Sequence, residues 1–527
     1  MKGKPSLIHH FLERSAESFP DSIAVVHDKK WESYAHVNRL TNRVAHGLIK
    51  SGVVPGDRVV LICENGLEYI FCYYGILKAG GIAVPLNTEL KPESIQELLG
   101  ELWPRALMVS AKFERLIRAV DMSQLDIQRL YVTRPGRSGL GAGGTISSLQ
   151  DLLSAQPDSN PDLEMDPRTC AMIVYTSGSA GKPKGAMLTH ANIVANTGSI
   201  VEYLNLTCND VQMVVLPFFY VMGKSLLNTH VAVGGRLVIN NKFAYTASVL
   251  KQMAEEGVTG FSGVPSTFAH LLFRSPLVEY RDKLPALRYC SQAGGHMPKH
   301  IKLELLKVLP PHTRLYIMYG ATEASARLTY VPPDFLRAKI ESIGKPISGV
   351  TIKVMSASGE VLKPGVTGEL VARGDNIMAG YYKDEESTRM VLDENGYHTG
   401  DLGYRDEDGF LYVTGRKDDQ FKVGGHRINP QEIEDIIIES GYAVECIVFG
   451  IPDPLLGHRL AGLVVPIETT PDAVSSILEF CRKKLPKHKI PEKLLLVETI
   501  PKTSSGKPDR TNSIRLFENR YNKGEES

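Results

Sequence analysis

The sequence lacks the features that would place it in a membrane or on a nucleic acid. No stretch approaches the roughly 20 apolar residues that a transmembrane helix needs, and the first 20 residues contain no apolar core of a secretory signal. The 60 Lys and Arg residues balance 59 Asp and Glu residues, which gives a net charge of +1 and no electrostatic case for nucleic acid. We therefore expect a cytoplasmic protein with no membrane span and no nucleic-acid partner.

Cysteine usage argues against a disulfide framework and against a zinc site. The seven cysteines are odd in number and widely spaced, and no two of them form a Cys-x-x-Cys pair. We expect reduced and mostly buried thiols.

The hydrophobic pattern indicates a folded α/β protein. A hydrophobic share of 43% over 527 residues excludes intrinsic disorder and allows several domains. Helical periodicity over residues 34–52 is followed by a short apolar strand at 58–62, a second helix ending at Gly80, and another strand at 82–86. This alternation predicts βαβ units and a parallel sheet covered by helices.

Three later segments differ from this pattern in composition and in the spacing of their apolar residues. Residues 134–166 are rich in Gly, Pro, Ser and Asp, which predicts a surface loop and a subdomain connection. Residues 349–410 combine glycines with short apolar runs, which favours antiparallel strands and turns. A small α+β domain is predicted after Gly415, from a helix at 430–440, a strand at 443–451 and a helix at 473–484.

The densest chemical signal is the loop Y-T-S-G-S-A-G-K-P-K-G from Tyr175 to Gly185, which follows an apolar strand at 171–175. Its glycines let the backbone approach an anion, and its hydroxyls and lysines can bind phosphate. The spacing fails the Walker pattern G-x-x-x-x-G-K-[ST], which argues against a P-loop switch protein. The candidate phosphate-binding residues are Thr176, Ser177, Gly178, Ser179, Lys182 and Lys184.

This loop resembles that of the adenylate-forming enzymes, which comprise acyl-CoA synthetases, stand-alone acyl- and aminoacyl-AMP ligases, and luciferases. Six or more separated motifs occur in the family's order from about Ser33 to Arg510. The resemblance implies a mixed α/β fold with a large N-terminal adenylation domain at 1–416, built of βα-layered sheets plus a β-barrel-like subdomain. It also implies a small mobile C-terminal α+β lid domain at 417–527.

The motif from Met318 to Glu323 offers a flat ring, a hydroxyl and a carboxylate in succession. A carboxylate oxygen is a ligand that Mg²⁺ prefers. By the resemblance, Tyr319 stacks on adenine, Thr322 contacts the α-phosphate and Glu323 binds magnesium.

Two further motifs are assigned to the nucleoside. A carboxylate can accept hydrogen bonds from both ribose hydroxyls. The resemblance gives this role to Asp401, with Arg416 helping to hold the ribose. The small residues of the loop S-Q-A-G-G, with Gly294 and Gly295, would let a planar base lie against the backbone.

The C-terminal motifs concern catalysis and domain motion. By the resemblance, Lys507 bridges the attacking carboxylate and the α-phosphate, because a point positive charge suits a phosphate that gains negative charge. Asp418 matches the family's hinge residue, and Gly424 and Gly425 would line the path of the incoming thiol.

The expected acyl pocket is lined by Phe219, Tyr220, Gly223 and Val264. Many family members carry His at the position of Tyr220, so any role that needs an imidazole is not expected here. The family usually has Thr or Ser where Ala180 stands, which predicts one missing hydrogen bond to phosphate.

The resemblance implies an acid–thiol ligase that uses ATP and Mg²⁺. A small carboxylic or amino acid is converted to acyl-AMP with release of pyrophosphate, and the acyl group then passes to a phosphopantetheine thiol. That thiol belongs to CoA or to an acyl or peptidyl carrier protein. The K-x-D-R form of 507–510 is common in carrier-loading aminoacyl enzymes.

Two alternatives remain at this point. One is a stand-alone aminoacyl-AMP ligase. Aminoacyl members that hold the substrate amine with a carboxylate usually have Asp near the position of Phe218, so the aromatic residue argues against the common amino acids and leaves proline or another unusual amino acid open. The other is a non-catalytic nucleotide-binding relative, which the presence of Lys507, Asp401, Glu323 and Lys184 together argues against.

Overall fold

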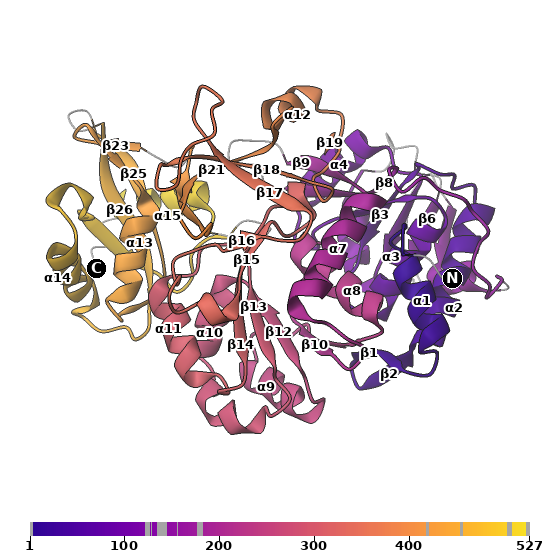
Figure 1. Cartoon of the computed structure of the whole chain (residues 1–527). Coiled ribbons are helices and arrows are strands. Elements are labelled where there is room, and N and C mark those ends of the chain that lie inside the picture. The colour runs from indigo at the N-terminus through magenta and orange to yellow at the C-terminus, as the bar shows by residue number, and fades with distance from the viewer. Residues whose placement is uncertain are drawn as a thin grey trace.

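The computed structural model is a mixed α/β protein with a large N-terminal domain and a small C-terminal domain, as predicted (Figure 1). It describes residues 4–121, 127, 129–133, 145–154, 156–176, 183–417, 421–453, 457–502 and 508–522.

One sheet of the N-terminal domain has eight strands in the order β19-β9-β8-β4-β3-β5-β6-β7. The strands from β8 to β7 pair in parallel, whereas β9 and β19 are antiparallel to their neighbours. Its strands are β3 (Arg58–Ile62), β4 (Ile82–Pro85), β5 (Ala106–Val109), β6 (Arg129–Val132), β7 (Thr145–Ser148), β8 (Cys170–Thr176), β9 (Lys184–Thr189) and β19 (Gly380–Tyr381).

Helices cover both faces of this sheet because both sides of its central strands are apolar. Val59 and Leu61 pack in the cluster that includes α2 and α3, whereas Val60 and Ile62 pack in the cluster that includes α4. Successive side chains of a strand point to opposite faces, so the run Arg58–Ile62 reads as continuously apolar. The helices of this part are α1 (His10–Ser18), α2 (Tyr34–Lys50), α3 (Leu67–Lys78), α4 (Pro92–Leu102), α5 (Glu114–Arg118), α6 (Leu149–Leu153) and α7 (His190–Leu204).

A second sheet has nine strands in the order β16-β15-β14-β13-β12-β10-β11-β1-β2, with parallel pairing from β14 to β1. Helices α9 to α11 pack on one face, and α7 and α8 pack on the other. The strands are β1 (Ile23–His27), β2 (Lys30–Ser33), β10 (Val211–Val214), β11 (Arg236–Ile239), β12 (Gly260–Gly263), β13 (Tyr289–Gln292), β14 (Arg314–Tyr319), β15 (Thr329–Val331) and β16 (Lys345–Pro346). The helices are α8 (Val221–Val233), α9 (Thr246–Glu255), α10 (Pro265–Phe273) and α11 (Lys299–Val308).

The third sheet confirms the antiparallel strands that the sequence predicts for residues 349–410. Strands β17, β18, β21 and β20 follow one another in the sheet, and β22 pairs with β21. This region also contains one short helix that the sequence analysis did not predict. The elements are β17 (Val350–Met355), β18 (Gly368–Gly374), α12 (Glu385–Val391), β20 (Leu392–Asp393), β21 (Gly396–Arg405) and β22 (Leu411–Arg416).

The C-terminal α+β part lies beside α10 and α11 of the N-terminal domain (Figure 1). A three-stranded sheet, β25-β26-β27, packs with three helices, and β23 and β24 form a separate hairpin. The elements are β23 (Phe421–Val423), β24 (His426–Ile428), α13 (Pro430–Glu439), β25 (Ala443–Asp453), β26 (Gly457–Pro466), α14 (Ala473–Lys484), β27 (Lys493–Leu496) and α15 (Arg510–Asn522). The three elements predicted here are confirmed within two residues.

The predicted loop at 134–166 contains regular structure. Strand β7 and helix α6 lie inside it, and a capping box joins them: the Ser148 hydroxyl accepts from the Asp151 backbone N–H, and the Asp151 carboxylate accepts from that of Ser148. The S-x-x-D signal of this cap is present in the sequence, but the surrounding Gly and Pro residues obscured it.

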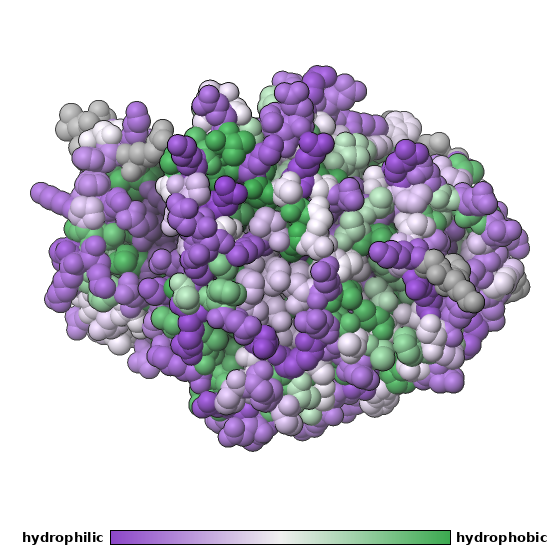
Figure 2. Space-filling view, in the orientation of Figure 1, coloured by the Kyte–Doolittle hydropathy of each residue, from purple (hydrophilic) through white to green (hydrophobic). Residues whose placement is uncertain are grey.

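Within the described ranges, no helix combines the length and the apolar character needed to cross a lipid bilayer. On the face drawn in Figure 2, hydrophobic residues form separate patches between hydrophilic ones.

Candidate active site

Four of the predicted motifs leave the same edge of the nine-stranded sheet. Strands β10, β12, β13 and β14 are parallel, so their carboxyl ends lie together, which is where open α/β sheets bind ligands. The motifs that follow these strands are Leu216–Gly223, Gly263–Thr267, Ser291–Gly295 and Tyr319–Glu323, respectively.

The loops of the expected acyl pocket converge on one another. Gly294 has φ +87°, and a Cβ at this position would lie 3.1 Å from Cγ1 of Val264 and 3.9 Å from Sδ of Met222. A Cβ on Gly223 would lie 2.0 Å from the Pro217 carbonyl oxygen, so glycine is required where α8 approaches the preceding loop. Three chain segments thus form one wall.

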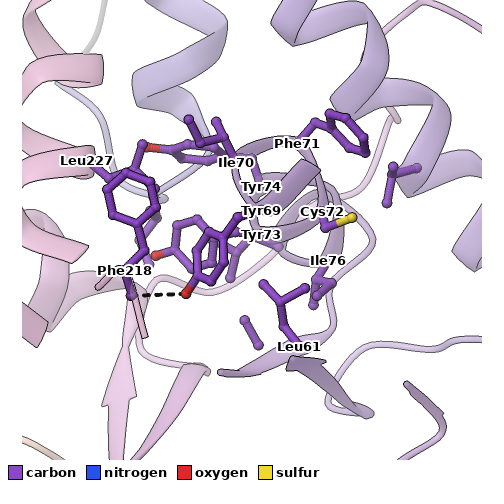
Figure 3. Packing of buried hydrophobic residues seen from close by; sticks show 14 of the residues in the cluster. Leu61, Tyr69, Ile70, Phe71, Cys72, Tyr73, Tyr74, Ile76, Phe218 and Leu227 are labelled. Atoms are coloured by element: carbon purple, nitrogen blue, oxygen red, sulfur yellow. Dashed lines mark hydrogen bonds between the residues drawn. The ribbon is translucent and has the colours of Figure 1, made fainter. Parts of the chain in front are cut away.

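The aromatic loop before α8 is fixed by helix α3 and by the loop that precedes it. The Tyr69 hydroxyl donates to the Phe218 carbonyl at 3.0 Å, and the Phe218 N–H donates to Oδ1 of Asn65 at 2.7 Å. Figure 3 shows Tyr69 reaching Phe218 from within the buried cluster. The rings of Phe219 and Tyr220 lie 4.4 Å apart. The loop that carries these two rings is therefore anchored at Phe218.

Three residues assigned to the nucleoside meet in space. The Tyr319 hydroxyl donates to Oδ2 of Asp401 at 2.5 Å, and Nε of Arg416 lies 3.1 Å from Oδ1 of the same carboxylate. Asp401 and Arg416 are also direct cross-strand partners on β21 and β22. Burial and the nearby Asp401 carboxylate hold the pKa of Tyr319 well above its usual value, so its phenol stays a donor.

The candidate magnesium ligand is joined to the end of the phosphate loop by a tyrosine. The Tyr381 hydroxyl donates to Oε1 of Glu323 at 2.8 Å, and Nζ of Lys184 lies 5.4 Å from the centroid of the Tyr381 ring. Burial raises the pKa of Tyr381, which keeps the hydroxyl protonated. Thr322 begins the 3-10 turn η3 (Thr322–Ala324), which packs on β9. Glu323, Thr322 and Lys184 therefore share one region.

Tyr381 was not identified by the sequence analysis. It lies in a Gly-Tyr-Tyr run whose composition is equally typical of a packed core, and its role depends on the pairing of β19 with β9.

The phosphate loop is the connection of a β-hairpin. Thr176 and Lys184 are cross-strand partners on β8 and β9, and the Thr176 hydroxyl donates to the Lys184 carbonyl at 3.4 Å. Strand β9 separates the loop from helix α7, unlike the direct strand–loop–helix order of a Walker loop. The predicted residues that lie outside the described part of the chain are Ser177, Gly178, Ser179, Ala180, Lys182, Asp418 and Lys507.

The residues around Glu323 fit a magnesium ion together with a phosphate chain. The half-buried carboxylate of Glu323 offers hard oxygen ligands, its partner Tyr381 fixes its orientation, and Lys184 adds a positive charge that suits phosphate.

Gly424 and Gly425 form the two-residue turn between β23 and β24. Their φ values are 55° and 85°, and the flanking Val423 and His426 are cross-strand partners. Positive φ at both central positions is the geometry of a tight hairpin turn, which glycine adopts without strain. The two glycines expected to line the thiol path thus form a compact turn.

The C-terminal part contacts the large domain through a few polar bonds and an apolar seam. Nε2 of His296 lies 3.0 Å from Oδ2 of Asp435, and the Arg274 guanidinium donates to the Pro466 carbonyl at 3.4 Å. The Asn429 side-chain amide donates to the Thr414 carbonyl. One apolar cluster also continues from α11 into α13.

Comparison with known proteins identifies matches along most of the chain. A family model for AMP-binding enzymes matches residues 12–382, and a model for the AMP-binding enzyme C-terminal domain matches residues 432–507. The 2-succinylbenzoate–CoA ligase of Bacillus cereus is 30% identical over 512 residues, which cover 97% of this chain and 98% of the ligase.

Solved structures agree with this result. The o-succinylbenzoate CoA synthetase of Bacillus subtilis, in complex with its acyl-adenylate intermediate, has a TM-score of 0.81 and 26% identity, covering 95% of this chain and 97% of the synthetase. The same enzyme with ATP and a magnesium ion has a TM-score of 0.80 and 25% identity, covering 96% and 99% of the two chains.

Proposed function

This chain belongs to the family of AMP-binding enzymes, and from that premise we propose that it is an ATP-dependent ligase that joins a carboxylic acid to the thiol of coenzyme A. Its relatives are CoA ligases. The observation that carries the proposal is the placement of the Tyr319–Asp401–Arg416 cluster and the Glu323–Tyr381–Lys184 cluster around loops at one sheet edge.

The first half-reaction activates the acid. A substrate carboxylate oxygen attacks the α-phosphorus of ATP, the bond from that phosphorus to the bridging oxygen breaks, and pyrophosphate leaves. Asp401, Arg416 and Tyr319 hold the nucleoside, with Gly294 and Gly295 beside the base. Lys507 stabilises the negative charge that develops at the α-phosphate.

The phosphates are held by a second set of residues. Thr322 contacts the α-phosphate, and the loop residues Thr176, Ser177, Gly178, Ser179, Lys182 and Lys184 hold the rest of the chain. A magnesium ion bound at Glu323 would neutralise part of the phosphate charge. The loop's hairpin supports this assignment, because cross-strand pairing fixes both of its ends.

The second half-reaction transfers the acyl group. The thiol sulfur attacks the carbonyl carbon of acyl-AMP, AMP leaves with the electron pair of the carbon–oxygen bond, and a thioester remains. We assign residues 1–416 to the adenylation domain and 417–527 to a lid that moves about Asp418. In the second step the turn Gly424–Gly425 lines the thiol path.

The test is an ATP–pyrophosphate exchange panel over fatty, aromatic and amino acids, followed by AMP release with CoA or with a phosphopantetheinylated carrier protein. We expect exchange with a subset of the acids and AMP release that depends on CoA. Release with carrier protein alone would identify a carrier-loading ligase, and nucleotide binding without exchange for any acid would contradict the proposal.

A further inference from the structure

Arg327 is a buried cation beside the expected acyl pocket. Its exposed fraction is 2%, and its guanidinium donates to the Ala326 carbonyl at 3.1 Å, to Sδ of Met318 at 3.4 Å and to Oγ of Ser225 at 3.5 Å. It forms no ion pair with a carboxylate among the described residues. A guanidinium has five N–H donors, and these acceptors, together with the Tyr203 phenol that also bonds Arg327, carry no negative charge.

Buried cations of the described chain differ in whether a carboxylate lies against them, and Lys302, which is 3% exposed, donates to the Ile340 carbonyl. Lys78 is equally buried but lies 3.1 Å from the carboxylate of Glu13, and Arg288 lies 2.8 Å from that of Asp210. A charge taken out of water is costly unless an opposite charge compensates it, and burial lowers the pKa of Arg327 accordingly. An anion bound beside Arg327 would therefore stabilise its charged form.

The position of Arg327 is fixed by its backbone. The side-chain amides of Asn196 and Asn376 both donate to the Arg327 carbonyl, each at 2.9 Å. Both amides are themselves buried. The backbone is thus anchored, and the guanidinium itself is confined by its burial and by its contacts with Met318 and Ser225, which suits selective binding of an anion.

That place is one helical turn beyond the wall of the acyl pocket. Met222 lies over Gly294 at the start of α8, and Ser225, which contacts Arg327, comes one turn later on the same helix. A turn of α-helix advances about 5.4 Å. Met318, the other side-chain partner, directly precedes Tyr319. The guanidinium therefore contacts α8 about one helical turn beyond the residue that lies over Gly294.

A second uncompensated cation lies on the neighbouring face of α8. Nζ of Lys224 donates to the Tyr69 hydroxyl at 2.6 Å and lies 3.5 Å from the Tyr73 ring centroid, with no ion pair to a carboxylate within the described ranges. It lines a small cavity with Ser225 and Asn196. Burial lowers the pKa of Lys224 well below its usual value, so a negative charge bound at this end of the helix would favour the charged form of both side chains.

We propose that Arg327 is a specificity-determining residue that binds a second carboxylate of the acid substrate, so that the enzyme activates dicarboxylic acids in preference to monocarboxylic acids. The inference rests on the proposed function, because it takes the acid to bind along α8. A carboxylate would accept two parallel hydrogen bonds from the guanidinium. A monocarboxylic acid would leave that cation buried and uncompensated, which disfavours its binding.

The experiment compares matched acid pairs in ATP–pyrophosphate exchange: hexanoate with adipate, octanoate with suberate, and benzoate with terephthalate. For at least one pair, kcat/KM of the wild type should be more than tenfold higher for the diacid. Arg327→Met should lower the value for that diacid more than tenfold through KM, while the value for the monoacid stays within threefold or rises. Arg327→Lys should retain part of the preference, and the exposed Arg373→Met should retain all of it.

A wild-type preference for monoacids in every pair would overturn the proposal, and so would an Arg327→Met variant that loses both activities equally with a raised KM for ATP. If no acid supports exchange, the proposed function fails, and the anion site is judged by binding. Adipate or suberate should then raise the melting temperature of the wild type but not of Arg327→Met. No shift in the wild type would refute the site.

Discussion

The Tyr381 hydroxyl donates a 2.8 Å hydrogen bond to Oε1 of Glu323, which precedes it by 58 positions in the sequence. Tyr381 lies on β19, which pairs with the hairpin strand β9, whereas Glu323 lies on the 3-10 turn after β14. One bond therefore connects the eight-stranded sheet to the nine-stranded sheet at the candidate magnesium ligand.

Removal of this bond should weaken metal-dependent nucleotide binding. We expect Tyr381→Phe to raise KM for MgATP about tenfold, equivalent to about 1.4 kcal/mol, because a fixed carboxylate becomes free to rotate. KM for the acid should change less than twofold. The measurement is the pyrophosphate exchange rate as a function of Mg²⁺ and ATP concentration. Tyr382→Phe, next in the chain, is the matched control, and equal increases in both KM values would contradict the assignment.

Asp401 should be the most sensitive of the nucleoside residues. We expect Asp401→Asn to raise KM for ATP roughly 10- to 100-fold, because the substitution removes the charge that Arg416 pairs with and one of two acceptors. Tyr319→Phe should raise KM for ATP less than Asp401→Asn does. The free-energy effect of the double variant should be smaller than the sum of the two single effects, since the two side chains share a hydrogen bond. Asp393→Asn serves as control. Strict additivity would show that the two residues act independently.

Lys507 should separate the two half-reactions. We expect Lys507→Ala to reduce adenylation at least 100-fold while thioester formation from supplied acyl-AMP stays within a few-fold of wild type. The control is Lys502→Ala, which removes a nearby lysine that lies 3.3 Å from Glu445. If both half-reactions fell together in Lys507→Ala, the two-conformation mechanism would be wrong.

His230 should contribute to loss of stability in acid. It is fully buried, with Nδ1 donating to the Leu226 carbonyl at 2.9 Å and Nε2 lying 3.3 Å from the Tyr289 hydroxyl oxygen. Burial lowers its pKa to about 4. As the pH falls below 6.5, the unfolded chain therefore takes up a proton that the folded chain does not, and stability decreases.

The measurement is the free energy of unfolding at pH 7 and pH 5 for the wild type and for His230→Gln. The wild type should lose about 2 kcal/mol more than the variant over this interval. Between pH 6.5 and pH 5, about 1.5 units, only the unfolded chain protonates His230, and each unit is worth about 1.36 kcal/mol. Identical losses in the two proteins would indicate that His230 titrates normally.

The sequence predicted elements whose pattern is local. Helices α2 and α13 and strand β3 follow from the spacing of apolar residues within one segment. The order of the motifs also indicated which loops would meet, because parallel strands bring their carboxyl ends together.

The missed residues depend on contacts between distant segments. Tyr381 acts through strand pairing, and Arg327 is notable only because no carboxylate among the described residues lies against it once the chain has folded. The sequence did not predict strand β9 for a related reason. The strand follows a glycine-rich loop, and it is stabilised by its pairing with both β8 and β19, which lie elsewhere in the sequence.

The loops of the expected acyl pocket and the residues of the expected nucleotide site belong to different segments, which affects how the acid specificity of such an enzyme can change. Phe219 and Tyr220 belong to the expected acyl pocket, whereas Asp401 and Tyr381 reach the expected nucleotide region from other sheets. Selection for a new acid can therefore act on one loop and the first turns of α8 while the phosphate chemistry is inherited unchanged. Among relatives that activate different acids, we expect the residue at position 327 to differ with the substrate and the aspartate at position 401 to be retained.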